Sequence, residues 1–170
     1  MRNQTPKKRI LLRGAAAALA LCMVLGFTAC GKKKAPAAIR VDLSGRVNTL
    51  DPQYCSTALE RCLLKNCMEG LLRRLPDGTM AEGCAENYSV SADGLRYTFT
   101  LRENLQWSDG EPLTAKDFVF AFRRLFRAET NSPYAVEFAA LENSAAVLAG
   151  QMPASALGVS APEPLQLVFR

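Results

Sequence analysis

Histidine is absent from this sequence of 170 residues. Without an imidazole, the chain cannot form a Ser-His-Asp or Cys-His catalytic site, and it cannot form a zinc site that uses histidine ligands. The six cysteines include no Cys-x-x-Cys pair, which is the spacing typical of structural zinc sites and of redox-active dithiols. These two absences argue against an enzyme, and we expect the protein to use no metal and no cofactor.

An excess of positive charge is also missing from most of the chain. The formal net charge is +5, but five of the 21 basic side chains precede residue 30, where no acid occurs. The remainder therefore carries 16 basic and 16 acidic side chains. A nucleic-acid-binding domain needs a basic stripe that extends into the folded part. We expect no nucleic-acid partner.

The basic start of the chain is followed by an uncharged run over residues 14–29. This run is shorter than the roughly 20 residues of a spanning helix, so it favours a secretory signal. It resembles a bacterial lipoprotein signal, which implies that residues 1–29 are removed and a lipid is attached to Cys30. The alternative is an uncleaved membrane anchor in which Cys30 has no role. Both interpretations place the rest of the chain outside the cytoplasm.

Residues 30–38 read CGKKKAPAA and indicate a flexible, basic linker. Three lysines next to a lipidated residue would add attraction to anionic headgroups, which strengthens a single lipid anchor. The alternative interpretation is that the linker is a solvated spacer whose positive charge has no function. The first interpretation adds a membrane contact to the anchor.

Four cysteines remain beyond the predicted signal and anchor: Cys55, Cys62, Cys67 and Cys84. On a helix, Cys62 and Cys67 would point roughly 140° apart, too far to share a metal, so we expect both to be small buried side chains. A disulfide among the four is possible outside the cytoplasm. A thiol hydrolase using Cys55 is the enzymatic alternative, but no partner base is apparent.

Periodicity predicts a mixed α/β fold. We expect a strand over 39–44, a helix over about 57–69 capped by Gly70, and a short hairpin around 76–78. A second hairpin turns at 93–94. Its buried face should hold alternate residues, namely Leu95, Tyr97, Phe99 and Leu101.

The following segment predicts a well-specified helix. Thr114 and Asp117 form a capping-box pattern, and the preceding Trp107 should be a packing anchor. The arginines at 123, 124 and 127 suit the end of the helix dipole, and we interpret them as a solvated helix end. A short helix ending at Gly150 and a strand over PLQLVFR should follow. The helix's inner face should consist of Phe118, Phe122, Leu125 and Phe126.

The run AENYSVSADGLRYTFTLRENLQWSDGEPLTAKDFVFAFRRL, flanked by NTLDPQ, MEGLLR and NSPYA, resembles a known family. It looks like the signature region of the extracytoplasmic solute-binding proteins of oligopeptide ABC transporters, family 5. The resemblance implies that residues 39–170 are the N-terminal part of a two-lobed periplasmic-binding-protein type II fold. They would contain the first lobe with its extra subdomain, without the second lobe. The implied function is a receptor that captures oligopeptides and delivers them to a permease.

The resemblance also implies a few ligand-binding positions. Ser56, Thr57 and Ala58 align with a loop that borders the peptide, and Tyr134 aligns with a tyrosine that reaches the ligand. Ser56 stands where some relatives have an acid, so a preference for a charged ligand end does not carry over. Tyr134 has an alternative role as an exposed aromatic at a helix start. Other functions left open are binding of a nickel complex, sugar or signalling peptide, and a non-functional truncated product.

Overall fold

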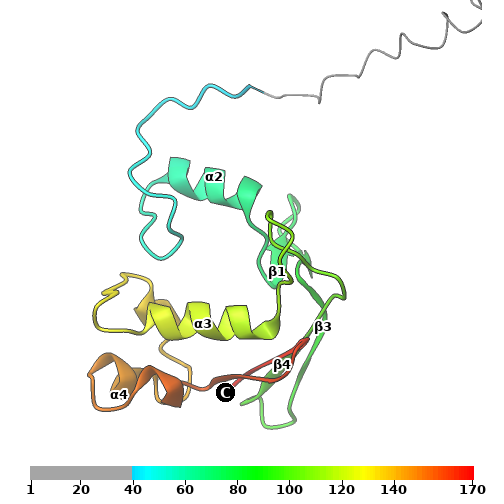
Figure 1. Cartoon of the computed structure of the whole chain (residues 1–170), viewed down its shortest axis with the longest axis vertical. Coiled ribbons are helices and arrows are strands. Elements are labelled where there is room, and N and C mark those ends of the chain that lie inside the picture. Colours follow the sequence, from blue (N-terminus) through cyan, green and yellow to red (C-terminus); the bar gives the residue numbers. More distant parts are fainter. Residues whose placement is uncertain (1–39) are drawn as a thin grey trace, which may run out of the picture. The chain divides into compact units, whose positions relative to one another are not determined.

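An antiparallel sheet of four strands organises the folded part of the protein (Figure 1). The computed structural model describes residues 40–170, of which Leu43–Arg170 form one compact unit. The strand order is β3-β4-β6-β5, so the last strand of the chain pairs with the second hairpin. The strands are β3 (Ala85–Val90), β4 (Tyr97–Leu101), β5 (Val159–Glu163) and β6 (Gln166–Phe169).

Pairing between β4 and β6 joins segments that lie about 70 residues apart in the sequence. Tyr97 is opposite Phe169, and Phe99 is opposite Leu167. Helix α3 (Ala115–Leu125) packs on β5 and β6 and closes the core on one face of the sheet. Leu101, Phe126 and Leu167 are fully buried, so the centre of the core lies between this helix and the two central strands.

Helix α3 begins as its sequence predicts. The capping box between Thr114 and Asp117 is present, and the Asp117 carboxylate accepts a hydrogen bond of 2.7 Å from the Thr114 backbone N–H. Its inner face also agrees with the prediction, since Leu125 and Phe126 are buried while Phe118 and Phe122 pack against the core. Local capping and periodicity therefore suffice to place this helix.

The remaining elements are short and surround this core. The predicted turn before Thr79 is confirmed, with Gly78 at a φ of +88°. Gly150 follows α4 at a φ of +70°, as expected for a glycine that ends a helix. These elements are α2 (Ala58–Cys67), β1 (Leu72–Arg74), β2 (Met80–Glu82), the 3₁₀ helices η1 (Ala135–Phe138) and η2 (Ala154–Ala156), and α4 (Ser144–Leu148).

Two boundary predictions are wrong. Residues 40–44 form no strand, because no neighbouring strand pairs with them and their side chains are mostly exposed. Helix α2 ends at Cys67 rather than at Gly70, since Met68 leaves the helix with extended backbone angles. The missing pairing partner explains the first error, and an early extended residue explains the second.

Several burial predictions are also wrong. Trp107 is 49% exposed and does not anchor the core. On the second hairpin, Leu95 is 71% exposed and Tyr97 is 43% exposed, so only the end of β4 near Leu101 is fully covered. Cys62 and Cys67 are exposed rather than buried, because α2 packs through Leu64 and Glu60 instead. Among the described residues no disulfide forms, and four cysteines have free thiols: Cys55, Cys62, Cys67 and Cys84.

The predicted signal peptide, the predicted lipidation site Cys30 and the whole of the predicted linker over 30–38 lie outside the described residues. Within residues 40–170, no helix has both the length and the hydrophobicity needed to span a bilayer. The same range contains no group of three or more acidic or cysteine side chains placed to hold a metal ion.

Replacing Phe126 with alanine tests the position of the core. Phe126 is fully buried, so Phe126→Ala should lower the free energy of unfolding by about 3–5 kcal/mol. Phe120 lies on the same helix but is 58% exposed, and Phe120→Ala should change it by less than about 0.5 kcal/mol. Urea denaturation followed by circular dichroism measures both. Equal losses for the two variants would contradict this arrangement.

Candidate functional site

A buried carboxylate holds the loop that precedes α2. Glu60 is 0% exposed, and its two oxygens accept hydrogen bonds from four backbone N–H groups. Oε1 accepts from Asn48 at 2.8 Å and Thr49 at 3.2 Å, and Oε2 accepts from Ser56 at 3.0 Å and Thr57 at 3.1 Å. These bonds, led by that from Thr57, lower the pKa of Glu60 to about 2 despite its burial. Glu60 therefore ties both ends of residues 48–57 to the first turn of α2.

The hydrogen bonds to Glu60 determine which groups of the predicted ligand loop, residues 56–58, are free to contact a ligand. The amides of Ser56 and Thr57 are bound to Glu60, and Thr57 is the N-cap of α2. The Ser56 and Ala58 side chains are exposed, whereas Thr57 is half-buried. The loop can therefore contact a ligand through the exposed Ser56 and Ala58 side chains, but not through these two N–H groups. Glu60 was not among the predicted site residues, although the pattern Thr-x-x-Glu from Thr57 to Glu60 signals a capping box.

The middle of the loop is attached to the segment that follows α3. Asp51 forms a two-pronged ion pair with Arg124, which lowers the pKa of the Asp51 carboxyl. Ser132 Oγ donates to the Gln53 carbonyl at 2.6 Å, and the Tyr134 hydroxyl donates to the Cys55 carbonyl. The interpretation of Arg124 as part of a solvated helix end is therefore wrong, because its guanidinium is paired with Asp51. Two loops distant in sequence form one connected wall.

Tyr134 has a structural partner as well as a place beside a cavity. Its hydroxyl proton is used by the Cys55 carbonyl, while its ring lines a groove of about 400 Å³. Cys55 is buried, and its thiol lies 3.6 Å from the Pro52 carbonyl, the contact of a weak donor with no neighbouring base. Among the described residues, the Cys55 thiol therefore has a carbonyl oxygen and not a base as its hydrogen-bond partner. The groove's apolar wall includes Pro52, Ala121, Phe122, Leu125 and Phe138.

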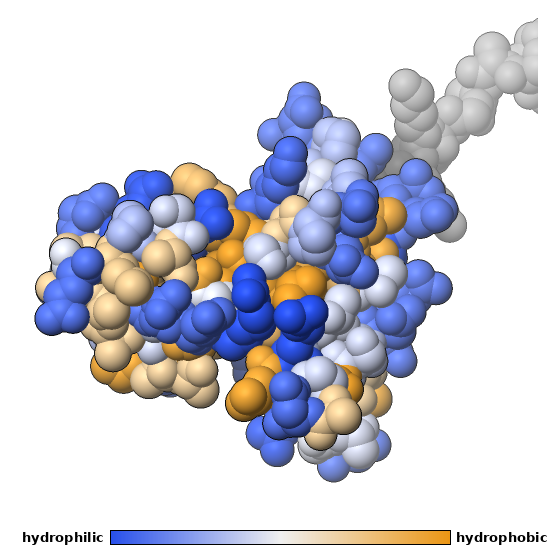
Figure 2. Space-filling view, turned by 90° about the horizontal axis from the view of Figure 1, so that it is seen from below, coloured by the Kyte–Doolittle hydropathy of each residue, from blue (hydrophilic) through white to orange (hydrophobic). Residues whose placement is uncertain are grey.

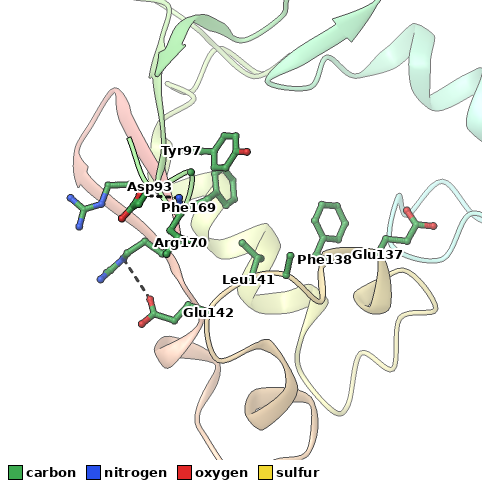
Figure 3. Close-up of a pocket in the computed structure, with 12 residues that line it drawn as sticks. Asp93, Tyr97, Glu137, Phe138, Leu141, Glu142, Phe169 and Arg170 are labelled. Atoms are coloured by element: carbon green, nitrogen blue, oxygen red, sulfur yellow. Dashed lines mark hydrogen bonds and ion pairs between the residues drawn. The ribbon is translucent and has the colours of Figure 1, made fainter. Parts of the chain in front are cut away.

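A larger hollow of about 730 Å³ adjoins this groove, because Glu137 and Phe138 line both. In Figure 3, Tyr97 and Phe169 lie together on one side of the hollow, while Phe138 and Leu141 lie along the other. Hydrophobic residues are exposed among hydrophilic ones on the face that Figure 2 shows. The hollow is therefore lined by aromatic and aliphatic groups from three separate segments.

Charged groups stand at the rim of the larger hollow. Arg170 and Glu142 form an ion pair of 3.7 Å between half-exposed side chains (Figure 3). Asp93 lies in the hairpin turn, where bonds from Ser91 and Leu95 lower the pKa of its carboxyl. A mostly hydrophobic lining with a few charged groups is typical of ligand-binding pockets in general.

Comparison with known proteins identifies the family. Residues 79–170 match the model of the bacterial extracellular solute-binding proteins, family 5 Middle. The chain belongs to this family. The chain is 33% identical over 155 residues to the dipeptide-binding protein of Lactococcus lactis, and this alignment covers 91% of the chain and 28% of that protein. It is 39% identical over 115 residues to a probable deoxycholate-binding periplasmic protein of Escherichia coli, covering 66% of this chain and 22% of that protein.

A solved structure agrees with the fold. The crystal structure of Haemophilus influenzae OppA in complex with the peptide RPPGFSPFR matches with a TM-score of 0.69 and 32% identity. The match covers 72% of this chain and 24% of that one, so the mixed α/β unit matches part of the substrate-binding protein fold. The family 5 chain spans between 21% and 28% of the lengths of the curated relatives it matches. Those relatives are named as binding proteins and not as enzymes, which agrees with what the sequence predicts for this chain.

Acid titration of stability tests the role of Glu60. A glutamine keeps one acceptor oxygen and turns an NH₂ group towards backbone amides that need an acceptor, so Glu60→Gln should destabilise the fold. The Glu60 pKa is about 2 in the fold against an ordinary 4.5. Its charged form therefore stabilises the fold above about pH 4.5, and this contribution is lost as the pH falls towards about 2.

The measurement is urea denaturation of both proteins from about pH 7 to about pH 2. The difference between wild type and Glu60→Gln should be largest at neutral pH and should shrink in acid. Glu86, an exposed acid on β3, provides the control, because Glu86→Gln should show little difference at any pH. A constant difference between wild type and Glu60→Gln would contradict the assignment.

Removal of the Tyr134 hydroxyl tests the connection between the two loops. Tyr134→Phe deletes the hydrogen bond to the Cys55 carbonyl and should lower the free energy of unfolding by about 1 kcal/mol. Tyr88 is 51% exposed and serves as the control, since Tyr88→Phe should change it by less than about 0.5 kcal/mol. Thermal denaturation compares them. The connection is refuted if Tyr134→Phe behaves like Tyr88→Phe.

Proposed function

We propose that the protein captures oligopeptides outside the cytoplasmic membrane and delivers them to the permease of an ABC importer. In this proposal residues 1–29 are a lipoprotein signal, Cys30 carries the lipid, and residues 39–170 belong to the first lobe. The single observation that carries the proposal is the rigid wall formed by residues 51–58 and Tyr134 beside an apolar groove, in a chain of this family.

The chemistry of the wall suits a peptide. Gln53 and Arg61 place polar side chains along the groove, and the Gln53 Oε1 atom, which has no hydrogen-bond donor among the described residues, can accept a hydrogen bond from a peptide N–H. The apolar groove around Phe122 and Phe138 can accommodate a side chain of the bound peptide. Binding by main-chain pairing and a permissive pocket needs no reactive group, which fits the absence of histidine.

A bile acid is the alternative ligand that one relative suggests. That relative is named as a probable deoxycholate-binding protein, and a rigid apolar steroid could also enter a groove of about 400 Å³. The structure favours the peptide, because the groove opens into the hollow beyond Phe138 and thus continues along an extended path. A direct competition between the two ligand classes discriminates them.

Photo-cross-linking of the full chain tests the proposal. A tripeptide with a central benzoylphenylalanine should form adducts within residues 52–61 and 134–138, mapped by mass spectrometry. Unlabelled peptide should displace the label, whereas an equal concentration of deoxycholate should not. Phe138→Asp should reduce the yield roughly fivefold or more, as expected for a charge placed in an apolar contact.

Val136 provides the matched control on the same 3₁₀ helix, because it is 70% exposed and lines neither hollow. Val136→Asp should leave the yield within about twofold of the wild type. Displacement of the label by deoxycholate, or adducts scattered over the surface, would reject peptide capture by this groove. Circular dichroism shows whether each variant remains folded.

A further inference from the structure

The outer side of α3 carries a basic stripe that the proposed peptide groove does not use. Lys116, Phe120 and Arg123 recur at intervals of three or four residues on α3, which places them within an arc of roughly 60°, and Arg127 follows just beyond the end of the helix. With Val119 and part of β5 they line a hollow of about 530 Å³. We call these four residues the α3 basic face.

The cations of this face lack acidic partners. The ion pairs found within residues 40–170 do not involve Lys116, Arg123 or Arg127. The Nε of Arg123 is buried and has no hydrogen-bond acceptor among the described residues. Arg127 makes only a cation–π contact, with its guanidinium 6.0 Å from the centre of the Phe120 ring. Unused donors are thus concentrated in one hollow.

Nearby acids do not neutralise the face. Asp117 is bound to the N–H and hydroxyl of Thr114 at the start of α3. Glu129 and Glu163 are exposed, and neither lines the hollow. Arg124, the neighbour of Arg123, points to Asp51 and belongs to the peptide-side wall. The face therefore keeps its positive charge and offers it to an external anion.

Phe120 indicates which anionic partner fits. Its ring is 58% exposed at the centre of the cations, and a solvated helix end has no need of an aromatic group there. Basic side chains around an exposed aromatic ring are typical of surfaces that lie in the interface of an anionic bilayer. There the ring enters the acyl boundary while the long basic side chains reach the phosphates.

The net charge of the described part is negative, so the α3 basic face contrasts with the rest of the surface. Eight of the 21 basic side chains precede residue 40, which leaves 13 basic against 16 acidic residues in the described part. An anionic bilayer would repel most of this surface and attract the α3 basic face, so it would orient the unit. A chain held at the membrane through Cys30, as the sequence predicts, would keep such a bilayer within reach.

We propose that the α3 basic face docks on anionic phospholipid headgroups, with the Phe120 ring at the bilayer interface. Docking would present the unit to the membrane by one side and leave the groove beside Tyr134 on a different face of α3. A phosphate-rich surface supplies several anions side by side, which matches cations spread along α3 and just beyond its end. This contact is independent of peptide capture.

Quenching of a single tryptophan by brominated lipids tests the proposal in the full chain. Trp107→Phe removes the one native tryptophan, and Phe120→Trp places the probe in the face. Reconstituted into brominated phosphatidylglycerol vesicles, this probe should be quenched at least about twofold more than in brominated phosphatidylcholine. Added salt of about 0.5 M should reduce the difference.

Two variants separate docking from mere tethering. Lys116→Gln with Arg127→Gln should weaken the contact roughly 25-fold, at roughly fivefold per charge, and return quenching to the phosphatidylcholine level. A probe at Val136→Trp, in the same Trp107→Phe background, should show little quenching in either lipid because it lies outside the face.

Three outcomes would overturn the proposal: equal quenching at positions 120 and 136, equal quenching in the two lipids, or full quenching in the Lys116→Gln and Arg127→Gln variant. Displacement from phosphatidylglycerol by an acidic peptide at constant ionic strength would also overturn it. That result would assign the face to an acidic protein partner instead. Since Phe120 is exposed, the probe should not perturb the fold, and circular dichroism verifies this.

Discussion

The wall beside the groove, formed by residues 51–58 and Tyr134, depends on the hydrogen bonds of the Glu60 carboxylate. A carboxylate that accepts four backbone N–H groups leaves residues 48–57 little freedom to move. The positions of Asp51 and Cys55 follow from these bonds. Asp51 in turn pairs with Arg124 near the end of α3, and the Cys55 carbonyl accepts a hydrogen bond from Tyr134. Recognition of an extended ligand gains from such a preorganised loop, because less conformational entropy is lost on binding.

The pairing of β4 with β6 supplies the second constraint. It brings Phe169 beside Phe99, where the two rings meet edge to face at 5.7 Å. Phe122 of α3 then contacts both Phe169 and Phe138. The groove and the larger hollow thus share walls with the hydrophobic core, so their shape is set by core packing rather than by flexible loops.

Sequence reasoning succeeded where the signal is local and failed where the partner is distant. The capping box at Thr114 and the turn at Gly78 depend on neighbouring residues alone, and both were predictable. The expected strand at 40–44 requires a pairing partner that the described residues do not provide. The exposure of Trp107 and the Tyr134–Cys55 bond depend on tertiary contacts, which no local pattern encodes. The ligand roles of Ser56, Thr57, Ala58 and Tyr134 remain predictions.

Three arginines near the end of α3 show why residue type alone is insufficient. Arg123 and Arg124 are adjacent, yet a helix turns roughly 100° per residue and sends them in different directions. Arg124 meets Asp51 and secures the wall beside the groove, whereas Arg123 and Arg127 line the hollow on the basic face. One helix therefore connects two surfaces with opposite requirements. Arg124 is held in place by its ion pair with Asp51, so it contributes to the rigidity of the wall. Arg123 and Arg127 form no ion pair among the described residues, so their charge can attract an anion.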